Sequence, residues 1–187
     1  PIVKEICRFA DEYGISAYDE QSGKGLLRHI YLRIGERTGE IMLCLVINGD
    51  KLSHSEKFVS LIREKFPSVV GILLSINKKN TNVVLGDKFI TLLGRDYIED
   101  ELCGLRFRVS ADSFYQVNRD GAEMLYGLAA ELADLKGGEV LMDLYCGTGT
   151  IGIIASKKAK KVTGVELNAD AVKDAKVNAE LNGIENI

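Results

Sequence analysis

The sequence predicts an α/β protein in two parts: an α+β domain with a mainly antiparallel sheet, then the β-α-β-α opening of a doubly wound parallel sheet. Two observations predict this division. In the first half, helix-like and strand-like stretches are mixed and are separated by short turns. In the second half, short apolar runs alternate with helix-like segments, which is typical of parallel strands joined by helices. The expected domains span residues 1–112 and 113–187.

The first domain is expected to open with an amphipathic helix and a hairpin. Apolar residues at helical spacing predict a helix over residues 2–13, which Gly14 ends. Two strands rich in apolar and β-branched residues should follow, at 26–34 and 40–47. Between them, residues 35–39 begin and end with glycine, which indicates a hairpin turn.

A second helix and several short strands complete the expected first domain. The helix should span residues 53–66, capped by Ser53 or Ser55 and closed by Pro67. Turns containing Asn, Lys and Gly divide the remaining residues into strand candidates. These candidates are residues 69–76, 83–85, 89–93 and 105–109.

The second domain alternates helix and strand along its whole length. Asn118 can cap a helix that Gly137 and Gly138 end. Its apolar face consists of Leu125, Leu128, Ala129, Leu132 and Leu135. A strand, a helix, a strand and a helix then follow at residues 140–144, 151–157, 162–166 and 169–181. Because two parallel strands cannot bury both of their faces alone, we expect the chain to be a piece of a longer protein.

The composition argues against several classes of protein. A chain of 187 residues with 46% hydrophobic content can bury a core, and no apolar run is long enough to span a bilayer. The net charge of −3 gives no global attraction to nucleic acid. Four scattered cysteines and two histidines predict neither a disulfide framework nor a metal site. Free thiols fit a cytoplasmic protein.

The most specific pattern lies between the two strands of the second domain. Residues Gly147-Thr-Gly-Thr-Ile-Gly152 match G-x-G-x-x-G, and Glu166 ends the next strand. Alone, this pattern permits a dinucleotide whose ribose hydroxyls bind Glu166. However, Asp143 at the preceding strand end would repel a pyrophosphate and favours a ligand that carries positive charge. We therefore expect S-adenosylmethionine, with its sulfonium and ammonium groups, and retain an NAD-dependent oxidoreductase as the alternative.

Residues within the turn have both structural and ligand-binding interpretations. Gly147 and Gly149 should let the backbone approach a ligand closely, although turn glycines can be purely conformational. Thr150 can cap the following helix, touch the ligand, or do both. Tyr145 either packs or contacts the cofactor. Cys146 is predicted to be a small buried residue and not a nucleophile, because no histidine flanks it.

Five segments together resemble one enzyme family. They are Gly25-Leu-Leu-Arg-His-Ile30, Phe114-Tyr-Gln-Val-Asn118, Asp143-Leu-Tyr-Cys-Gly-Thr-Gly149, Gly164-Val-Glu166 and Asn178-Ala-Glu-Leu-Asn-Gly183. This set closely resembles the RNA uridine C5-methyltransferase family, which makes 5-methyluridine in ribosomal or transfer RNA. The resemblance covers nearly the whole chain, and within the family we favour the ribosomal branch, with 23S rRNA as substrate.

The resemblance implies an S-adenosylmethionine-dependent RNA (uracil-5-)-methyltransferase with a Rossmann-like catalytic domain. It places Gln116, Tyr145 and Glu166 at family positions that bind the cofactor, and Thr150 at a more variable contact position. With the residues chosen above, the candidate cofactor-binding set is Gln116, Asp143, Tyr145, Gly147, Gly149, Thr150 and Glu166.

Catalytic groups of the family are not expected among these residues. In the family, a cysteine thiolate adds to uracil C6, and a carboxylate base later removes the C5 proton. Both groups should lie beyond Ile187, so we expect no methyl transfer by this chain alone. We also expect no metal and no iron–sulfur cluster in it.

RNA is the expected partner, although the charge balance is not basic. Residues 1–112 carry 16 basic and 16 acidic side chains, and residues 113–187 carry 8 and 11. Arg28, Arg33 and Arg37 form either a local basic patch or, as we prefer, ordinary surface residues around the hairpin. Arg28 and His29 match a recurrent family motif, and a structural role is favoured for them. A non-catalytic RNA-binding module remains a second alternative.

Overall fold

The computed structural model describes residues 1–187, which divide into two compact units. Unit 1 comprises residues 1–34 and 39–98, and unit 2 comprises residues 35–38 and 99–187. The predicted domain boundary at residue 112 thus lies inside unit 2. None of the helices combines the length and the apolar character that crossing a membrane requires.

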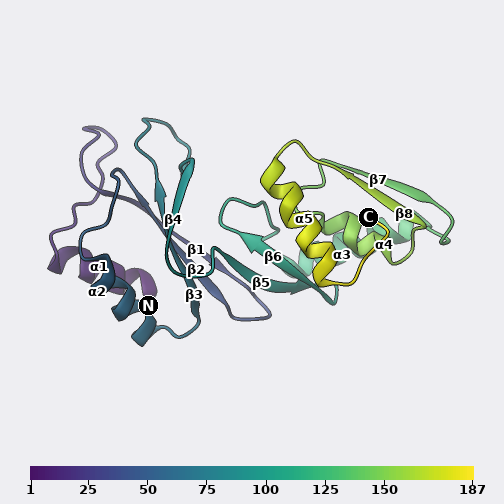
Figure 1. The fold of residues 1–187 in the computed structure, drawn as a ribbon, viewed down its shortest axis with the longest axis horizontal. Coiled ribbons are helices and arrows are strands. Elements are labelled where there is room, and N and C mark those ends of the chain that lie inside the picture. The colour runs from purple at the N-terminus through teal and green to yellow at the C-terminus, as the bar shows by residue number, and fades with distance from the viewer. The chain divides into compact units, whose positions relative to one another are not determined.

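Unit 1 is a four-stranded sheet with two helices (Figure 1). Its elements are α1 (Ile2–Glu12), β1 (Leu27–Ile34), β2 (Ile41–Ile47), α2 (Ser55–Lys65), β3 (Val69–Ile76) and β4 (Lys88–Gly94). The strands lie in the order β1-β2-β3-β4; the two outer pairs are antiparallel, and β2 is parallel to β3. The mainly antiparallel sheet is therefore confirmed, with one parallel pair that α2 connects.

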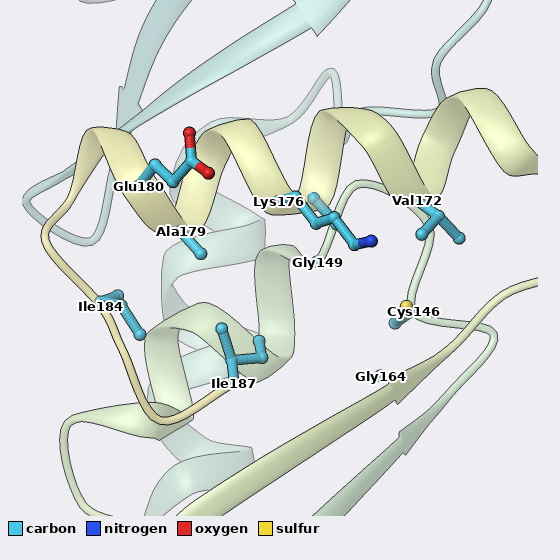
Figure 2. Close-up of a pocket in the computed structure, with 10 residues that line it drawn as sticks. Cys146, Gly149, Gly164, Val172, Lys176, Ala179, Glu180, Ile184 and Ile187 are labelled. Atoms are coloured by element: carbon cyan, nitrogen blue, oxygen red, sulfur yellow. The ribbon is translucent and has the colours of Figure 1, made fainter.

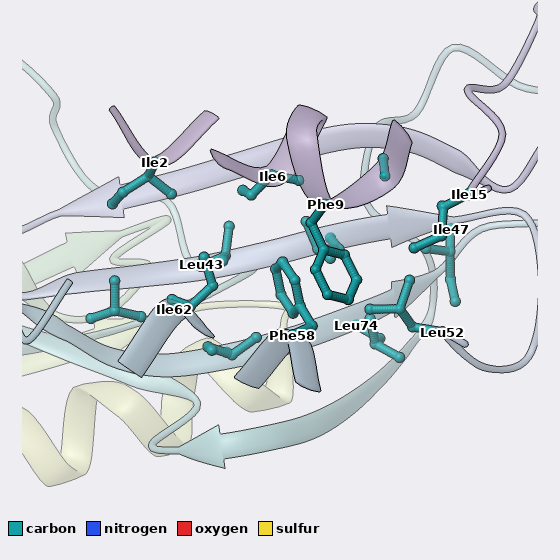
Figure 3. Close-up of a cluster of buried hydrophobic side chains, with 14 residues drawn as sticks. Ile2, Ile6, Phe9, Ile15, Leu43, Ile47, Leu52, Phe58, Ile62 and Leu74 are labelled. Atoms are coloured by element: carbon teal, nitrogen blue, oxygen red, sulfur yellow. The ribbon is translucent and has the colours of Figure 1, made fainter. Parts of the chain in front are cut away.

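The core of unit 1 lies between the sheet and both helices, as Figure 3 shows. The apolar face predicted for the first helix is the buried face of α1. Its Phe9 ring meets the ring of Phe58 from α2, with centroids 5.1 Å apart. Strand residues complete the cluster, among them Leu43, Leu45, Ile47, Ile72 and Leu74.

Two predicted details of unit 1 are wrong. Residues 83–85 form part of a loop and not a strand, because the Asn77 amide donates to the carbonyl oxygens of Val83 (2.7 Å) and Val84 (3.1 Å). The second helix begins at Ser55 without a capping side chain. The residue before it, His54, adopts the left-handed conformation with φ 56°.

Arg28 holds the loop that follows β3. Its side chain is 1% exposed and donates to the carbonyl oxygens of Asn77 (3.0 Å) and Lys79 (2.8 Å). The guanidinium also lies 4.3 Å from the ring centroid of Tyr18 and 3.6 Å from the Glu20 carboxylate. Neither a basic patch nor a solvated surface role therefore holds for Arg28, which is a buried structural residue.

Unit 2 contains a two-stranded sheet and a separate parallel strand pair with helices (Figure 1). Its elements are β5 (Tyr97–Leu102), which begins at the unit boundary, β6 (Leu105–Ser110), α3 (Arg119–Leu132), β7 (Val140–Leu144), α4 (Thr150–Ser156), β8 (Lys161–Val165) and α5 (Ala169–Leu181). The predicted β-α-β-α order and the parallel pairing of β7 with β8 are confirmed. β5 was not expected from the sequence.

The face that α3 buries is not the apolar face read from the sequence. Asn118 caps it as expected, since its side-chain oxygen accepts a hydrogen bond from Gly121 N at 3.0 Å. The buried residues include Ala122 and Tyr126, whereas Leu132 in the predicted face is 77% exposed. The leucines have the expected helical spacing, and Leu125, Leu128 and Leu132 are exposed in this structure.

Candidate cofactor site

The turn between β7 and α4 is built from residues in the left-handed conformation. Tyr145, Gly147 and Gly149 have φ angles of 61°, 53° and 79°. For a non-glycine residue this conformation costs on the order of 1 kcal/mol. The side chain of Tyr145 is 90% exposed, so packing against the protein does not hold it there. Its aromatic face is presented to solvent at the carboxyl end of β7.

The two central glycines of the turn have different surroundings. A Cβ atom placed on Gly147 would meet no heavy atom within 4 Å, so the space beside this residue is open. A Cβ atom on Gly149 would lie 3.0 Å from the Ala175 Cβ and 3.2 Å from the Ile153 Cδ1. The geometry therefore leaves room for a ligand at Gly147 and places Gly149 close to α4 and α5.

Glu166 holds the turn through its carboxylate. Oε2 accepts a hydrogen bond from Gly147 N at 3.0 Å, and Oε1 accepts from Leu167 N (2.8 Å) and Asn168 N (2.9 Å). The bonds from Asn168 and then Gly147 are the main reasons why the pKa of Glu166 lies below its usual value. The predicted ribose-binding residue is thus ionised at neutral pH and bonded to a predicted turn glycine.

Asp143 is bonded to the helix that follows the turn. Its Oδ2 accepts a hydrogen bond from Gly152 N at 2.8 Å. Burial raises the pKa of this half-buried carboxyl, and the bond from Gly152 opposes that rise. Together with Glu166, Asp143 places a second carboxylate against the backbone N–H groups of the G-x-G-x-x-G segment.

Gln116 lies between β6 and α3, and its side chain influences Tyr126 of α3, a residue that the sequence did not single out. Burial is the main cause that raises the pKa of Tyr126, and the Gln116 side chain opposes that rise. The charges of Cys103 and Asp143 raise this pKa further.

Thr150 does not cap α4, contrary to one of its expected roles. The N-cap position is Gly149, and no side chain accepts a capping bond there. The Oγ1 atom of Thr150 lies 3.3 Å from that of Thr148, within hydrogen-bond distance. Its expected contact with a ligand stays a prediction.

Cys146 packs against β8 in agreement with its expected structural role. A Cβ atom on Gly164 would lie 2.9 Å from the Cys146 Sγ, so the glycine leaves room for the thiol. Burial, followed by the charges of Asp143 and Glu166, raises the pKa of Cys146. The thiol is therefore protonated at neutral pH and poorly suited to act as a nucleophile. Gly164 is a further residue whose role the sequence did not reveal.

A cavity of about 330 Å³ opens between the turn, β8 and α5 (Figure 2). Gly149 and Cys146 line it from the turn, and Lys176 and Glu180 line it from α5. Of the predicted cofactor residues, only Gly149 belongs to its lining. The structure thus joins Gly147 to Glu166 and Gly152 to Asp143, but it does not gather the predicted set around this cavity.

Comparison with known proteins gives a family match over much of the chain. The model of the family described as tRNA (uracil-5-)-methyltransferase matches residues 74–187. A relative from Clostridium acetobutylicum, named an uncharacterized RNA methyltransferase, is 46% identical over 185 residues. Another of that description, from Halalkalibacterium halodurans, is 42% identical over 186 residues. The chain is covered over 99% and 100% of its length but spans only 40% and 41% of these relatives.

A solved structure of similar fold comes from Pyrococcus abyssi. It is a tRNA (uracil-54, C5)-methyltransferase in complex with S-adenosyl-L-homocysteine. The TM-score is 0.81 at 27% sequence identity, over 98% of this chain and 44% of that one. A complex described as that of aTrm5 and tRNALeu shares the fold at a TM-score of 0.52 and 21% identity.

Proposed function

The chain belongs to the tRNA (uracil-5-)-methyltransferase family, and from this premise we propose that it is part of an enzyme that methylates C5 of a uridine in RNA. The methyl donor is S-adenosylmethionine, in agreement with the solved relative that holds S-adenosyl-L-homocysteine. For the RNA we propose 23S rRNA, on the resemblance of the sequence motifs. Transfer RNA, which the Pyrococcus abyssi relative methylates by its name, is the competing substrate.

The observation that carries the choice of cofactor is the pair of carboxylates at the turn. In dinucleotide sites, the N–H groups of a G-x-G-x-x-G turn receive a pyrophosphate. Here Glu166 already accepts from Gly147 N, and Asp143 already accepts from Gly152 N. A pyrophosphate would be repelled by these two negative charges, and it would find the N–H groups of Gly147 and Gly152 already hydrogen-bonded. A sulfonium cation and ribose hydroxyls suit the same groups, so the turn favours S-adenosylmethionine over NAD.

In the proposed mechanism, this chain binds the methyl donor and the remainder of the protein activates the uracil. S-adenosylmethionine supplies an electrophilic methyl group on its sulfonium. Glu166 would accept hydrogen bonds from the ribose hydroxyls of the cofactor, Asp143 would offer a negative charge to its cationic part, and Gly147 would leave room for the ligand. Activation of uracil requires a cysteine thiolate from elsewhere in the protein. Within this chain, burial raises the pKa of Cys44 to about 12, and that of Cys146 is raised as well.

The cofactor proposal is tested by calorimetric titration of the full-length protein with S-adenosylmethionine and with NAD. We expect a saturable binding signal for S-adenosylmethionine and none for NAD. Binding of NAD alone would overturn the proposal and support the oxidoreductase alternative.

The reaction is tested with RNA transcribed in vitro. The full-length protein and S-adenosylmethionine are incubated with 23S rRNA and, separately, with tRNA, and nucleosides are analysed by mass spectrometry for 5-methyluridine. We expect the product in 23S rRNA, and product in tRNA alone would move the substrate to the other branch. Cofactor binding without product from either RNA would support the non-catalytic module. The 187-residue chain alone should give no product.

Asp143→Asn is expected to weaken binding of S-adenosylmethionine roughly tenfold and binding of S-adenosyl-L-homocysteine much less. Asparagine keeps an oxygen that can accept from Gly152 N but removes the charge, and only S-adenosylmethionine carries a sulfonium. Loss of one partly screened charge pair is worth roughly 1–2 kcal/mol. The measurement is the ratio of the two dissociation constants, with the exposed Asp112→Asn as the matched control.

The same substitution should not lower the thermal stability. Since the pKa of Asp143 is raised in the folded state, the native protein holds this proton more tightly than the unfolded chain does. Stability from this group is therefore greatest below its unfolded pKa and declines as pH rises through the folded pKa, so the ionised form is unfavourable at pH 7. In the binding experiment, an equal rise of the dissociation constants for S-adenosylmethionine and S-adenosyl-L-homocysteine would assign Asp143 a purely structural role.

A further inference from the structure

Three polar side chains form a row along one face of α5, which we call the polar ladder. Asp174, Asn178 and the C-cap residue Asn182 are spaced four residues apart, so they lie on the same side of the helix. Asn178 has no exposed surface, and Asp174 is also buried. Buried polar groups are costly unless they are hydrogen-bonded. All three are, and their partners come from distant parts of unit 2.

Two members of the polar ladder bond to β6 much as a neighbouring strand would. The Asn182 side chain accepts from Arg106 N (2.9 Å) and donates to Arg106 O (2.6 Å). Asn178 repeats this with Arg108, accepting from N (2.7 Å) and donating to O (3.3 Å). Four helical residues rise about 6 Å, and two strand residues rise about 6.6 Å. The two amides therefore match alternate residues of β6.

Asn178 alone also reaches the cofactor turn. Its amide nitrogen donates to the carbonyl oxygen of Thr148 at 3.2 Å. Thr148 lies between Gly147 and Gly149 and is itself buried. One helical turn earlier on α5, Ala175 packs against Gly149. The helix thus fixes the turn by one hydrogen bond and one close packing contact.

The first member of the polar ladder holds the other candidate segment. Asp174 Oδ2 accepts from the hydroxyl groups of Ser110 and Ser113, each at 2.7 Å. Ser113 lies three residues before Gln116. One face of α5 therefore binds both the segment that carries Gln116 and the turn that carries Gly147.

We propose that Asn178 is a positioning residue for the cofactor turn. It sets the place of the Thr148 carbonyl, and hence of the flanking glycines, relative to β6 and the Gln116 segment. In this role Asn178 acts through Thr148 and does not itself contact the reacting atoms. This inference rests on the proposed function only in taking the turn as the place where S-adenosylmethionine binds.

The test compares Asn178→Ala with Asn182→Ala in the full-length protein. Both substitutions remove an amide that bonds to β6, but only the first removes a bond to the turn. The first measurement is hydrogen exchange of the backbone amides of residues 145–150 without cofactor. Their hydrogen-bonded members include Gly147 and Gly149. We expect exchange at least tenfold faster in Asn178→Ala and no change at these amides in Asn182→Ala.

The second measurement separates cofactor binding from RNA binding. Asn178→Ala should raise the KM for S-adenosylmethionine about tenfold and leave the KM for RNA unchanged, whereas Asn182→Ala should change neither. Equal effects of the two variants on exchange and KM would show a merely structural role and overturn the proposal. Faster exchange at the turn in a protein that binds no S-adenosylmethionine would support the positioning role and overturn the proposed function.

A conservative variant covers the case in which Asn178→Ala fails to fold. Asn178→Gln retains the donor and the acceptor on a side chain that is one methylene longer. We expect the exchange rate at residues 145–150 and the KM for S-adenosylmethionine of this variant to lie between the wild-type values and the tenfold higher values expected for Asn178→Ala. The proposal would be contradicted if a folded Asn178→Gln protein, in which exchange at the β6 amides shows that the side chain has shifted, kept wild-type exchange at residues 145–150 and a wild-type KM for S-adenosylmethionine.

Discussion

Replacing Glu166 with alanine in the full-length protein is expected to weaken S-adenosylmethionine binding about a hundredfold. The substitution removes the charged acceptor proposed for the ribose hydroxyls, and hydrogen bonds to a charged group are stronger than those between neutral groups. It also releases the N–H groups of Gly147, Leu167 and Asn168, which the carboxylate now holds. Two consequences thus act together: the ligand loses a partner and the turn loses its anchor.

Calorimetric titration measures the dissociation constant of the Glu166→Ala variant, with the exposed Glu185→Ala as the control. An unchanged constant for Glu166→Ala would contradict the assignment. The pH dependence gives an independent check. Because backbone donors lower the pKa of Glu166, its charge is lost only as pH falls through a value below 4.5. The contribution of this residue to binding should therefore be constant from pH 7 down to about 5.

The second large effect is expected at Arg28. Arg28→Met should lower the free energy of unfolding of unit 1 by about 3 kcal/mol, since it breaks a network of hydrogen bonds around a side chain that is only 1% exposed. The carbonyl oxygens of Asn77 and Lys79 lose their donor, and the Tyr18 ring loses its cation. For a unit of roughly 100 residues, this corresponds to a fall in Tm of more than about 10 °C.

Urea unfolding of the full-length protein, followed by hydrogen exchange of the β2 and β3 amides, measures this effect in unit 1. Arg63→Met on the exposed side of α2 is the matched control and should change little. Arg28→Lys should not restore stability, because an ammonium cannot reproduce the planar fork whose Nη1 reaches the Asn77 and Lys79 carbonyl oxygens while Nη2 faces that of Thr81. Equal stability of Arg28→Met and Arg63→Met would show that the buried guanidinium is dispensable.

Local patterns predicted most of the elements, and long-range contacts account for the errors. The alternation of strand and helix after residue 139 is a sequence-local signal, and the structure confirms it. Residues 83–85 have the apolar composition of a strand, but their carbonyl groups bond to the side chain of Asn77. The leucines of α3 have helical spacing, yet spacing alone does not say which neighbour covers a face. Tyr126 lies on the face that is buried.

In the candidate site too, local patterns pointed to some residues and long-range contacts hid others. Asp143 and Glu166 were predictable because the carboxyl ends of neighbouring parallel strands meet at one edge of a sheet. The bonds that they make to the turn had no sequence signal. Asn178 was visible only as part of a recurring motif, because its partner Arg108 lies 70 residues earlier. Asparagines four residues apart on the inward face of a helix are the pattern that could have pointed to it.

The polar ladder also determines when during synthesis the cofactor turn can reach its final form. The turn and β6 leave the ribosome before α5, yet Asn178 bonds to Thr148 and Arg108, which precede it by 30 and 70 residues. Contacts so distant in sequence form late, because the loop between them must first be closed. A nascent chain that ends before residue 178 therefore carries the glycine turn without this fixation. Under the proposed function, capture of the methyl donor therefore depends on the completed helix and not on the turn alone.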